Sequence, residues 1–364
     1  MKDNYSAPYT LYDLNRLSKN YIEIKKLFKS DQIFYAVKSN KLFPVLKTLN
    51  SEKCSFEVNT EPELDAVLKT GGNVKNIVNS APVKTSQCIS YMYSRGVNRF
   101  AFDSYDEVNK ISENASGTNL FLRVYTSNEG SGQALNTKYG ANISDAVDLI
   151  DYAISLGFNV FGITFSVGSQ CENIPNWNSA LKLISPLFKK YSSLNTIDIG
   201  GGFPIEYVGG SLSISEIANT INTALQKYYD KRPSLFLEPG RYLSGSIGKT
   251  VSSVIGLREN KEVKWCIIDV SIFGGFLELF EFGEDFSYKV TTDSKSKEKF
   301  VYNIAGPTCD GCDILLRDIT LPKLKRGDHL TFYNTGAYTN EYASDFNGFP
   351  RPKTIFMKDG KVLS

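Results

Sequence analysis

The sequence predicts an α/β fold: a (β/α)8 barrel followed by a C-terminal antiparallel β domain. Eight short apolar runs, rich in β-branched and aromatic residues, recur through the first two thirds of the chain, and helical patterns fill several of the intervals between them. After about residue 247 no long helical period appears, and short β-like runs are separated by Gly, Asp, Asn and Lys clusters. A chain of 364 residues has room for both domains, since one barrel uses about 250 residues.

The eight runs are continuously apolar, which is typical of parallel strands that are buried on both faces. They lie at 33–37, 54–58, 76–79, 99–103, 120–125, 160–165, 196–199 and 235–238. Helical patterns occupy Glu63–Thr70 and Asp145–Gly157, and a further helix is expected to begin at Ser213, where Ser213 and Glu216 form a capping box. Eight such strand–helix units fit a closed barrel, and an open doubly wound sheet is the alternative that this pattern leaves.

The C-terminal third is expected to form β-strands at 250–257, 263–270, 299–306 and 329–336. The first dozen residues are expected to add a strand to the same domain. We therefore assign residues 13–247 to the barrel domain, and residues 1–12 and 248–364 to the β domain.

Composition and charge exclude several classes of protein. Hydrophobic residues make up 41% of the chain and charged residues 22%, as in ordinary globular proteins. The 41 basic and 39 acidic residues leave a net charge of +2, which gives no broad basic field for nucleic acid. No apolar run reaches the roughly 18 residues of a membrane helix, and the first residues lack the apolar core of a signal peptide. We therefore expect a cytoplasmic protein that binds neither nucleic acid nor membrane.

The cysteines and the one histidine limit the chemistry further. Six cysteines are too few for a disulfide scaffold, and only Cys309 and Cys312 have the C-x-x-C spacing of a zinc or redox pair, without a second pair to complete it. His329 is the only histidine and stands at the start of an expected strand, which excludes multi-histidine metal sites within one chain. We expect reduced thiols and no metal site.

Polar residues follow the expected strands at one end of the barrel, where the active sites of such barrels lie. In strand order they are Lys38, Ser166 and Ser169, then Gly200, Gly201 and Gly202, and finally Glu238, Gly240 and Arg241. The glycine turn lets backbone N–H groups approach an anion, and Arg241 on the next loop can fork onto phosphate. A tight turn and a surface salt bridge are the plainer explanation of the same residues.

Lys38 ends an apolar strand and is expected to be desolvated, with a depressed pKa that suits a Schiff base. A strand-end lysine that extends into water is the alternative. Lys38 and a phosphate site in one mouth together indicate pyridoxal 5'-phosphate held at both ends, with Glu238 beside the pyridine nitrogen. A capping or salt-bridging carboxylate is the alternative for Glu238.

Six motifs in order carry a resemblance to a known family. They are FYAVKSN (34–40), FSVGSQ (165–170), DIGGGFP (198–204), EPGRYL (238–243), GPTCDGCD (306–313) and GAYT (336–339), the last followed by SDFNGF (344–349). Across nearly its whole length the chain resembles the fold-type III pyridoxal-phosphate decarboxylases, which include the ornithine and diaminopimelate decarboxylases. The resemblance implies an alanine-racemase-like barrel with a β domain, and a homodimer whose subunits share their active sites.

The resemblance also implies roles for individual residues. Lys38 corresponds to the Schiff-base lysine, Glu238 to the partner of the pyridine nitrogen, and Cys309 to the acid that reprotonates the α-carbon. Asp310 corresponds to a substrate-binding carboxylate that, with Cys309, acts across the dimer interface, and Phe346 corresponds to an aromatic wall of the substrate site. The residues implied to cradle or support the cofactor and its lysine are Ser169, Gly202, Gly240, Arg241, Tyr338, Arg123 and Glu63.

Two departures from the family pattern bear on the site. The family usually has a ring-stacking histidine where Ser166 stands, and serine has no ring to stack. The ornithine enzymes carry an aspartate for the distal amine close to Phe282, whereas the carboxylates of this chain are offset from that position. Glu281 is the candidate for a cationic end of the substrate, and a solvated acidic loop is the alternative.

The sequence therefore predicts α-decarboxylation of an L-amino acid through a Lys38 Schiff base on pyridoxal phosphate, with a diamino acid or a conjugated amino acid of secondary metabolism as the substrate. Two alternatives remain: an amino-acid racemase of the alanine-racemase type, and a catalytically silent homologue that regulates a decarboxylase through mixed dimers. The motifs GPTCDGCD and GAYT favour the decarboxylase over the racemase. Ser166 favours the silent homologue, whereas Lys38 and Cys309 argue against it.

Overall fold

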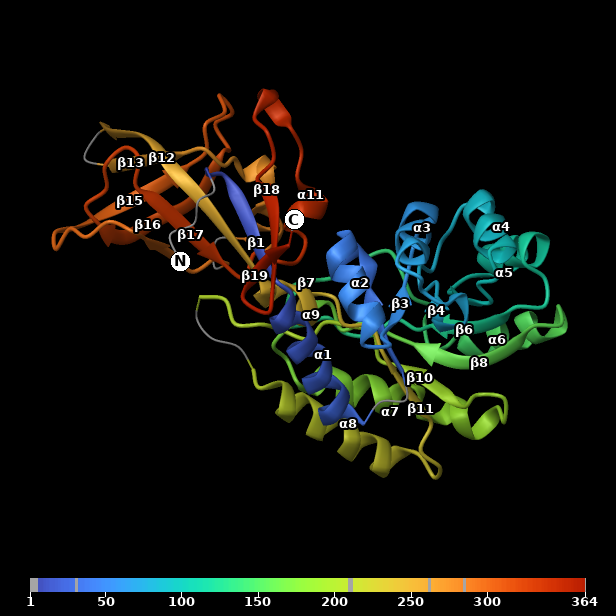
Figure 1. The fold of residues 1–364 in the computed structure, drawn as a ribbon. Helices are drawn as coiled ribbons and strands as arrows, with labels where there is room; N and C mark the ends of the chain where they lie inside the picture. Colours follow the sequence, from blue (N-terminus) through green and yellow to red (C-terminus); the bar gives the residue numbers. More distant parts are fainter. Residues whose placement is uncertain (1–5, 30–31, 209–211, 261–262, 284–285, 364) are drawn as a thin grey trace. The chain divides into compact units, whose positions relative to one another are not determined.

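The computed structural model describes residues 6–29, 32–208, 212–260, 263–283 and 286–363 (Figure 1). The chain divides into two compact units. The barrel unit consists of Ser18–Pro204 and Ser211–Leu243, and the β unit consists of Met1–Leu17, Ile205–Gly210 and Ser244–Ser364. The assignment of residues 13–247 and of residues 1–12 with 248–364 to separate functional domains stays a prediction.

The barrel unit contains the eight parallel strands that the apolar runs predicted. In sheet order they are β4 (Ile77–Val78), β3 (Ser55–Glu57), β2 (Gln32–Ala36), β11 (Ser234–Leu237), β10 (Thr196–Asp198), β8 (Asn159–Thr164), β6 (Asn119–Arg123) and β5 (Arg99–Phe102). The end strands β4 and β5 meet at Asn79, which forms a parallel bridge with Phe100 and backbone hydrogen bonds with Arg99 and Ala101. The sheet is therefore a nearly closed barrel, and the open doubly wound alternative is wrong.

Eight helices alternate with these strands. They are α1 (Leu14–Phe28), α2 (Phe43–Ser51), α3 (Glu61–Lys69), α4 (Ser86–Ser94), α5 (Tyr105–Asn114), α6 (Ala146–Ser155), α7 (Pro175–Lys190) and α8 (Ile214–Tyr228). Figure 1 shows α7 and α8 side by side along the outside of the barrel. The α3 and α6 helices match the predicted patterns to within about two residues.

The predicted capping box at the start of α8 is wrong. Ser213 holds the N-cap position, but its side chain caps no backbone N–H group, because Ser213 Oγ is hydrogen-bonded to Ser215 Oγ at 2.6 Å. A backbone hydrogen bond from Glu216 N to Ser213 O, 3.0 Å long, closes the first turn instead. A second hydroxyl two residues away competes successfully with the backbone for the Ser213 side chain.

Aromatic side chains fill the middle of the barrel. Phe34 on β2 packs against Phe236 on β11 with ring centroids 5.0 Å apart, and Phe121 packs against Phe161 at 5.7 Å. Phe34 and Phe121 form a buried cluster with Val78 and Ala101, and Phe161 and Phe236 are partly buried against it. Because this apolar layer excludes water, charged groups at the adjacent strand ends lose much of their hydration.

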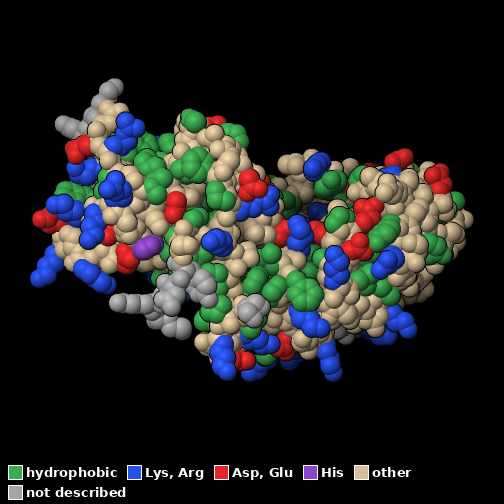
Figure 2. Space-filling model, turned by 45° about the horizontal axis from the view of Figure 1, so that its top comes forward, with side chains coloured by type: hydrophobic (Ala, Val, Ile, Leu, Met, Phe, Trp, Pro, Cys, Tyr) green, Lys and Arg blue, Asp and Glu red, His purple; other side chains and the backbone are tan. Residues whose placement is uncertain are grey.

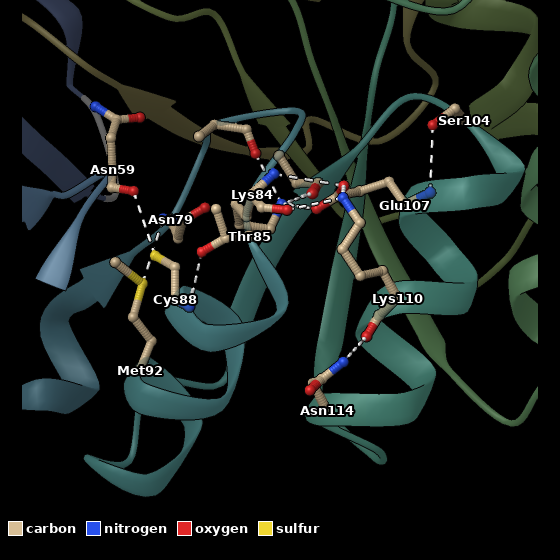
Figure 3. Close-up of polar contacts among 12 residues, drawn as sticks. Asn59, Asn79, Lys84, Thr85, Cys88, Met92, Ser104, Glu107, Lys110 and Asn114 are labelled. Atoms are coloured by element: carbon tan, nitrogen blue, oxygen red, sulfur yellow. Dashed lines mark hydrogen bonds and ion pairs between the residues drawn. The ribbon is translucent and has the colours of Figure 1, made fainter.

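A buried ion network ties the loop after β4 to β5 and α5 (Figure 3). Lys84 Nζ lies 2.8 Å from Glu107 Oε1, and both side chains are fully buried. Lys84 Nζ also donates to the carbonyls of Ala81 and Ala101 at 2.8 and 2.7 Å. Lys110 Nζ donates to Glu107 Oε2 at 2.6 Å and to the Lys84 carbonyl at 2.7 Å. The buried ammonium of Lys84 thus has two carbonyl acceptors and a carboxylate partner, which is the condition under which a buried ion pair is tolerated.

The β unit is built on one mixed sheet. Its strands are β1 (Tyr9–Asp13), β12 (Gly248–Asn260), β13 (Val263–Ile268), β14 (Val290–Thr292), β15 (Lys299–Ala305), β16 (Ile314–Pro322), β17 (His329–Tyr333), β18 (Lys353–Lys358) and β19 (Lys361–Leu363). The predicted N-terminal strand is present as β1, antiparallel to β12 and parallel to β18. The pairing of β13 with β15 is also parallel, so the sheet is not antiparallel throughout.

The face drawn in Figure 2 carries charged side chains of both signs. Figure 2 shows basic and acidic side chains interspersed over the visible face, in keeping with the net charge of +2. Within the part of the chain that the structure describes, no helix has both the length and the apolar character needed to cross a bilayer.

Candidate active site

The lysine predicted to bind the cofactor forms an ion pair at the mouth of the barrel. Lys38 lies in the 3-10 turn η1 (Val37–Ser39), directly after β2, and Glu57 ends the neighbouring strand β3. Lys38 Nζ donates to Glu57 Oε2 at 3.0 Å, where Glu57 is fully buried and the lysine side chain is 45% exposed. The lysine is therefore ion-paired and partly open to solvent, and the expectation that it is desolvated is wrong.

Two further carboxyl groups and a guanidinium group surround this pair. Asp198 ends β10, Glu238 follows β11, and Arg123 ends β6. Burial raises the pKa of Asp198 to about 6, and burial together with the charge of Asp198 raises the pKa of Glu238 well above its usual range. Burial lowers the pKa of Arg123, and the charges of Glu238, Glu57 and Asp198 act in the opposite direction. The mouth therefore holds acidic groups that are poorly hydrated, and the charge of one group shifts the pKa of its neighbours.

The predicted glycine turn joins two strand ends closely. Gly200 N donates to Asp198 Oδ1 at 2.9 Å, and Gly200 O accepts from Glu238 N at 2.8 Å. Gly200 and Gly202 have φ values of +64° and +88°, which favour glycine. A Cβ atom on Gly201 would lie 2.6 Å from Glu238 O. Three glycines are therefore required here for both conformation and space.

The predicted anion-binding arginine is buried beside this turn. Arg241 begins the short helix α9 (Arg241–Ser244) and is 4% exposed. Its Nε and Nη2 atoms donate to Ser169 Oγ at 3.3 and 3.1 Å. Ser169 lies on β9 (Ser169–Cys171), which pairs with β7 (Ser131–Gln133). Gly240, directly before Arg241, is buried and accepts a hydrogen bond from Leu243 N at 3.1 Å. A surface salt bridge therefore does not explain Arg241.

Ser166 is held by the loops around it. Its hydroxyl accepts from Gly168 N at 3.3 Å, and its carbonyl accepts from Thr126 Oγ1 at 2.8 Å and from Asn128 Nδ2 at 2.7 Å. The hydroxyl thus stabilises a turn that contains Gly168 at a φ of +91°. Serine shapes the loop at this position and offers no aromatic face.

Two carboxylates of the site, Glu57 and Asp198, were missed by the sequence analysis. Glu57 lies within the predicted strand 54–58 and Asp198 within 196–199, so an acidic residue inside an apolar run was the available signal. Glu63, which was predicted, lies in the first turn of α3, and its Oε2 atom accepts from Asn59 N at 2.7 Å. Burial and the charge of Glu57 raise the pKa of Glu63.

In the β unit, the GPTCDGCD motif forms the turn between β15 and β16. Asp313 anchors it, accepting from Ile272 N at 2.7 Å and from both Thr308 N and Thr308 Oγ1, at 3.0 and 2.7 Å. Cys309 is exposed and its Sγ atom donates to Asn347 Oδ1 at 3.3 Å. Asp310 is exposed and its Oδ1 atom accepts from the backbone N–H of Cys312 at 2.9 Å. The buried aspartate thus presents a thiol and a carboxylate on one accessible turn.

Three other predicted residues also lie in the β unit. Tyr338 has a φ of +57°, precedes α11 (Thr339–Tyr342) and stacks on Tyr342 with ring centroids 6.1 Å apart. Phe346 is 45% exposed and packs on Phe273 at 4.6 Å. Glu281 is exposed at the end of α10 (Glu278–Glu281). The roles implied for these residues stay predictions.

The barrel unit has the groups that pyridoxal phosphate requires. Lys38 offers an amine near the glycine turn, and Arg241 with Ser169 offers buried donors for a phosphate group. Buried oxygens Glu238 Oε1 and Glu57 Oε1 have no hydrogen-bond donor among the described residues. An acidic oxygen in this place suits a protonated pyridine nitrogen. The residues present therefore fit the cofactor.

Comparisons with known proteins agree with this fit. A model of the family described as pyridoxal-dependent decarboxylase, pyridoxal binding domain, matches residues 14–245. The lysine/ornithine decarboxylase of Selenomonas ruminantium is 30% identical over 358 residues, covering 97% of this chain and 90% of that protein. Antizyme inhibitor 2 of Xenopus laevis is 29% identical over 357 residues, covering 93% of this chain and 78% of that protein.

Solved structures give the same result. The lysine/ornithine decarboxylase from Vibrio vulnificus, complexed with cadaverine, has a TM-score of 0.91 at 28% identity and covers 98% of this chain and 96% of that one. The structure of SrLDC in complex with PLP and cadaverine has a TM-score of 0.90 at 29% identity, covering 98% and 92%. The chain therefore belongs to the fold-type III pyridoxal-phosphate-dependent decarboxylases, carboxy-lyases of the ornithine, lysine and arginine type.

Proposed function

We propose that this chain decarboxylates an L-amino acid, with the cofactor bound covalently at Lys38 Nζ. The observation that carries the proposal is the set of groups at the barrel mouth: the Lys38 amine beside Glu57, the glycine turn, and the buried Arg241. Bound pyridoxal phosphate supplies the electron sink into which the carbon–carbon bond breaks. The protein supplies the binding groups, the orientation and the proton transfers.

In this proposal four residues of the barrel unit hold the phosphate: Ser169, Gly202, Gly240 and Arg241. Gly200 and Gly201 give the turn its shape, and Ser166 stabilises the loop beside it. Arg123 supports the cofactor, and Glu238 faces the pyridine nitrogen. Tyr338 of the β unit adds a phosphate donor.

Cys309 gives a proton to the α-carbon, and Asp310 and Phe346 bind the substrate. We propose that the protein is a homodimer in which Cys309 and Asp310 act in the partner's site. Light scattering on the purified protein would test whether the dimer forms.

The proposed substrate is a diamino acid or a conjugated amino acid of secondary metabolism. The solved relatives include complexes with cadaverine and putrescine, which are diamines. In this chain Phe282, close to the expected position of the amine-binding aspartate, stacks on Phe286 with ring centroids 4.5 Å apart. Glu281, the residue before it, is exposed and is the carboxylate proposed for a cationic substrate end. An aromatic pair beside a displaced carboxylate supports a substrate whose distal group differs from that of ornithine.

A second candidate function is a silent homologue that regulates an active decarboxylase. It is supported by the similarity to antizyme inhibitor 2 and by Ser166, which provides no ring to stack on the cofactor. The Lys38–Glu57 pair and the buried Arg241 support the enzyme instead, because a chain without catalysis has no need of an amine and a phosphate cradle in one mouth.

Carbon dioxide release separates these functions. The purified protein with pyridoxal phosphate is offered ornithine, lysine, arginine, diaminopimelate and conjugated diamino acids, and we expect release from at least one of them. Lys38→Arg should lose both activity and the cofactor label that borohydride fixes, whereas Lys41→Arg, a neighbouring exposed lysine, should keep both. A protein that binds the cofactor and releases no carbon dioxide from any substrate would support the regulator. Chiral analysis of unreacted substrate tests the racemase.

We also retain the cytoplasm as the predicted compartment, and cell fractionation followed by immunoblotting would test it.

A further inference from the structure

Two carboxyl groups at the barrel mouth are hydrogen-bonded to each other. Asp198 ends β10, Glu238 follows β11, and their side chains share a hydrogen bond. An ionised carboxylate only accepts hydrogen bonds, so one group of the pair must carry a proton. A contact of this kind between two acids is favourable only when one of them is protonated.

The backbone fixes the two groups in this arrangement. Asp198 Oδ1 accepts from Gly200 N at 2.9 Å, and Glu238 N donates to Gly200 O at 2.8 Å, so one glycine holds both residues. In the described part of the chain, neither Asp198 Oδ2 nor Glu238 Oε1 has a nitrogen or hydroxyl donor, although both atoms are buried. Unsatisfied buried oxygens are costly, and a proton between the two carboxyl groups removes that cost.

The charges that face the pair come from three other elements. Glu57 on β3 is negative, while Lys38 in η1 and Arg123 on β6 are positive. Glu57, Asp198 and Glu238 are three carboxyl groups against the two cations, and Glu63 beside Glu57 and Asp103 beside Arg123 add further acidic groups. One proton on the pair therefore reduces the excess negative charge, which is favourable at low local dielectric.

We propose that Asp198 is a positioning residue that holds a proton on Glu238, and that this proton passes to the pyridine nitrogen when pyridoxal 5'-phosphate binds. The O–H bond of Glu238 breaks, an N–H bond forms on the ring, and both side chains are left as carboxylates. The proton of the pyridine nitrogen thus comes from Glu238 and not from water. This inference rests on the role proposed above for Glu238.

The number of protons taken up on cofactor binding tests the proposal. Pyridoxal 5'-phosphate is titrated into the apoprotein by calorimetry in buffers of different ionisation enthalpy. We expect Asp198→Asn to take up about one proton more per site than the wild type. The asparagine keeps an oxygen for Gly200 N and donates an amide N–H to Glu238, which therefore stays a carboxylate, and the ring proton must then come from water. Equal uptake by the two proteins would overturn the proposal.

Asp103→Asn is the matched control. Asp103 directly follows β5, is raised in pKa by burial, and accepts a glycine N–H, that of Gly140, at 2.8 Å. This variant should take up the same number of protons as the wild type. If Asp198→Asn does not fold, infrared difference spectra of the wild type still decide: a protonated carboxyl band must disappear when the cofactor is added, and its persistence would overturn the proposal.

Glu238→Gln distinguishes a failure of this inference from a failure of the assigned role of Glu238. If Glu238 faces the ring nitrogen, the visible absorption spectrum of the bound cofactor must differ between Glu238→Gln and the wild type at the same pH. Unchanged spectra and unchanged proton uptake in both variants would remove the role of Glu238, and the proposal with it. A changed spectrum in Glu238→Gln with unchanged uptake in Asp198→Asn would overturn the part of Asp198 alone.

Discussion

At the scale of single residues, one turn of the β unit places two thiols in different chemical settings. The Cys309 thiol donates to a side-chain amide oxygen of Asn347 and is open to solvent. The Cys312 thiol is hydrogen-bonded to the carboxylate of Asp310, and this contact raises the pKa of Cys312. The Cys309 side chain therefore contacts an amide and the Cys312 side chain a carboxylate, and Cys309 is the thiol that we propose as the proton donor.

We predict that Cys309→Ala lowers kcat at least about 100-fold and leaves the affinity for pyridoxal phosphate unchanged, because general acids contribute about that much and Cys309 is not among the groups proposed to bind the cofactor. The measurements are steady-state carbon dioxide release and cofactor titration. Cys312→Ala is the control and should change kcat only slightly. Turnover by Cys309→Ala at the wild-type rate would remove the acid role from this residue.

Site residues could be predicted from the sequence where the residues next to them in the chain form a recognisable pattern. Arg241 stands directly after a strand and a glycine, and the structure places it, buried, on Ser169. The partnership of Asp198 with Glu238, and that of Lys38 with Glu57, join positions far apart in the sequence. The pairing of neighbouring parallel strands, β2 with β3 and β10 with β11, brings these residues together, so spacing along the chain did not reveal them. The same strand pairing explains why Lys38 is ion-paired and was wrongly expected to be desolvated.

At the scale of elements, the apolar runs predicted all eight barrel strands, because parallel strands buried on both faces need continuous apolar sequence. The sheet of the β unit was predicted less completely. Its parallel pairs, β1 with β18 and β13 with β15, join segments separated by connections that carry no periodic signal. The capping box at Ser213 failed for a local reason, since Ser215 competes for its hydroxyl.

The ion network of α5 is an element-scale feature with a measurable effect on stability. Glu107 neutralises the fully buried Lys84 and also binds Lys110 (Figure 3). We predict that Glu107→Gln lowers the free energy of unfolding by about 3–5 kcal/mol, because removing one partner leaves a buried ammonium uncompensated. Glu113→Gln, an exposed position on the same helix, should change it by less than about 0.5 kcal/mol. Urea unfolding measures both, and equal midpoints for the two variants would contradict the prediction.

At the scale of the whole molecule, the acidic groups on the surface differ from those at the barrel mouth. Those on the surface are mixed with basic side chains (Figure 2) and contribute little to stability. Those at the barrel mouth are buried or half-buried, and burial raises the pKa of Asp198, Glu238 and Glu63. Because all three shifts have the same sign, each of these acids lowers the stability of the fold as pH rises.

We predict that the apoprotein becomes less stable, relative to Asp198→Asn, as pH rises from about 4 to about 6. The pKa of Asp198 is raised from 3.8 in the unfolded chain to about 6 in the folded one, so in this window the folded state binds more protons than the unfolded state. Stability then falls with increasing pH, and the shift of about two pK units corresponds to roughly 3 kcal/mol. The raised pKa of Glu238 extends the fall to higher pH. Thermal unfolding of the two apoproteins at about pH 5 and about pH 8 measures the effect. The wild type should gain more in Tm than Asp198→Asn when the pH is lowered, and parallel pH profiles would contradict the prediction.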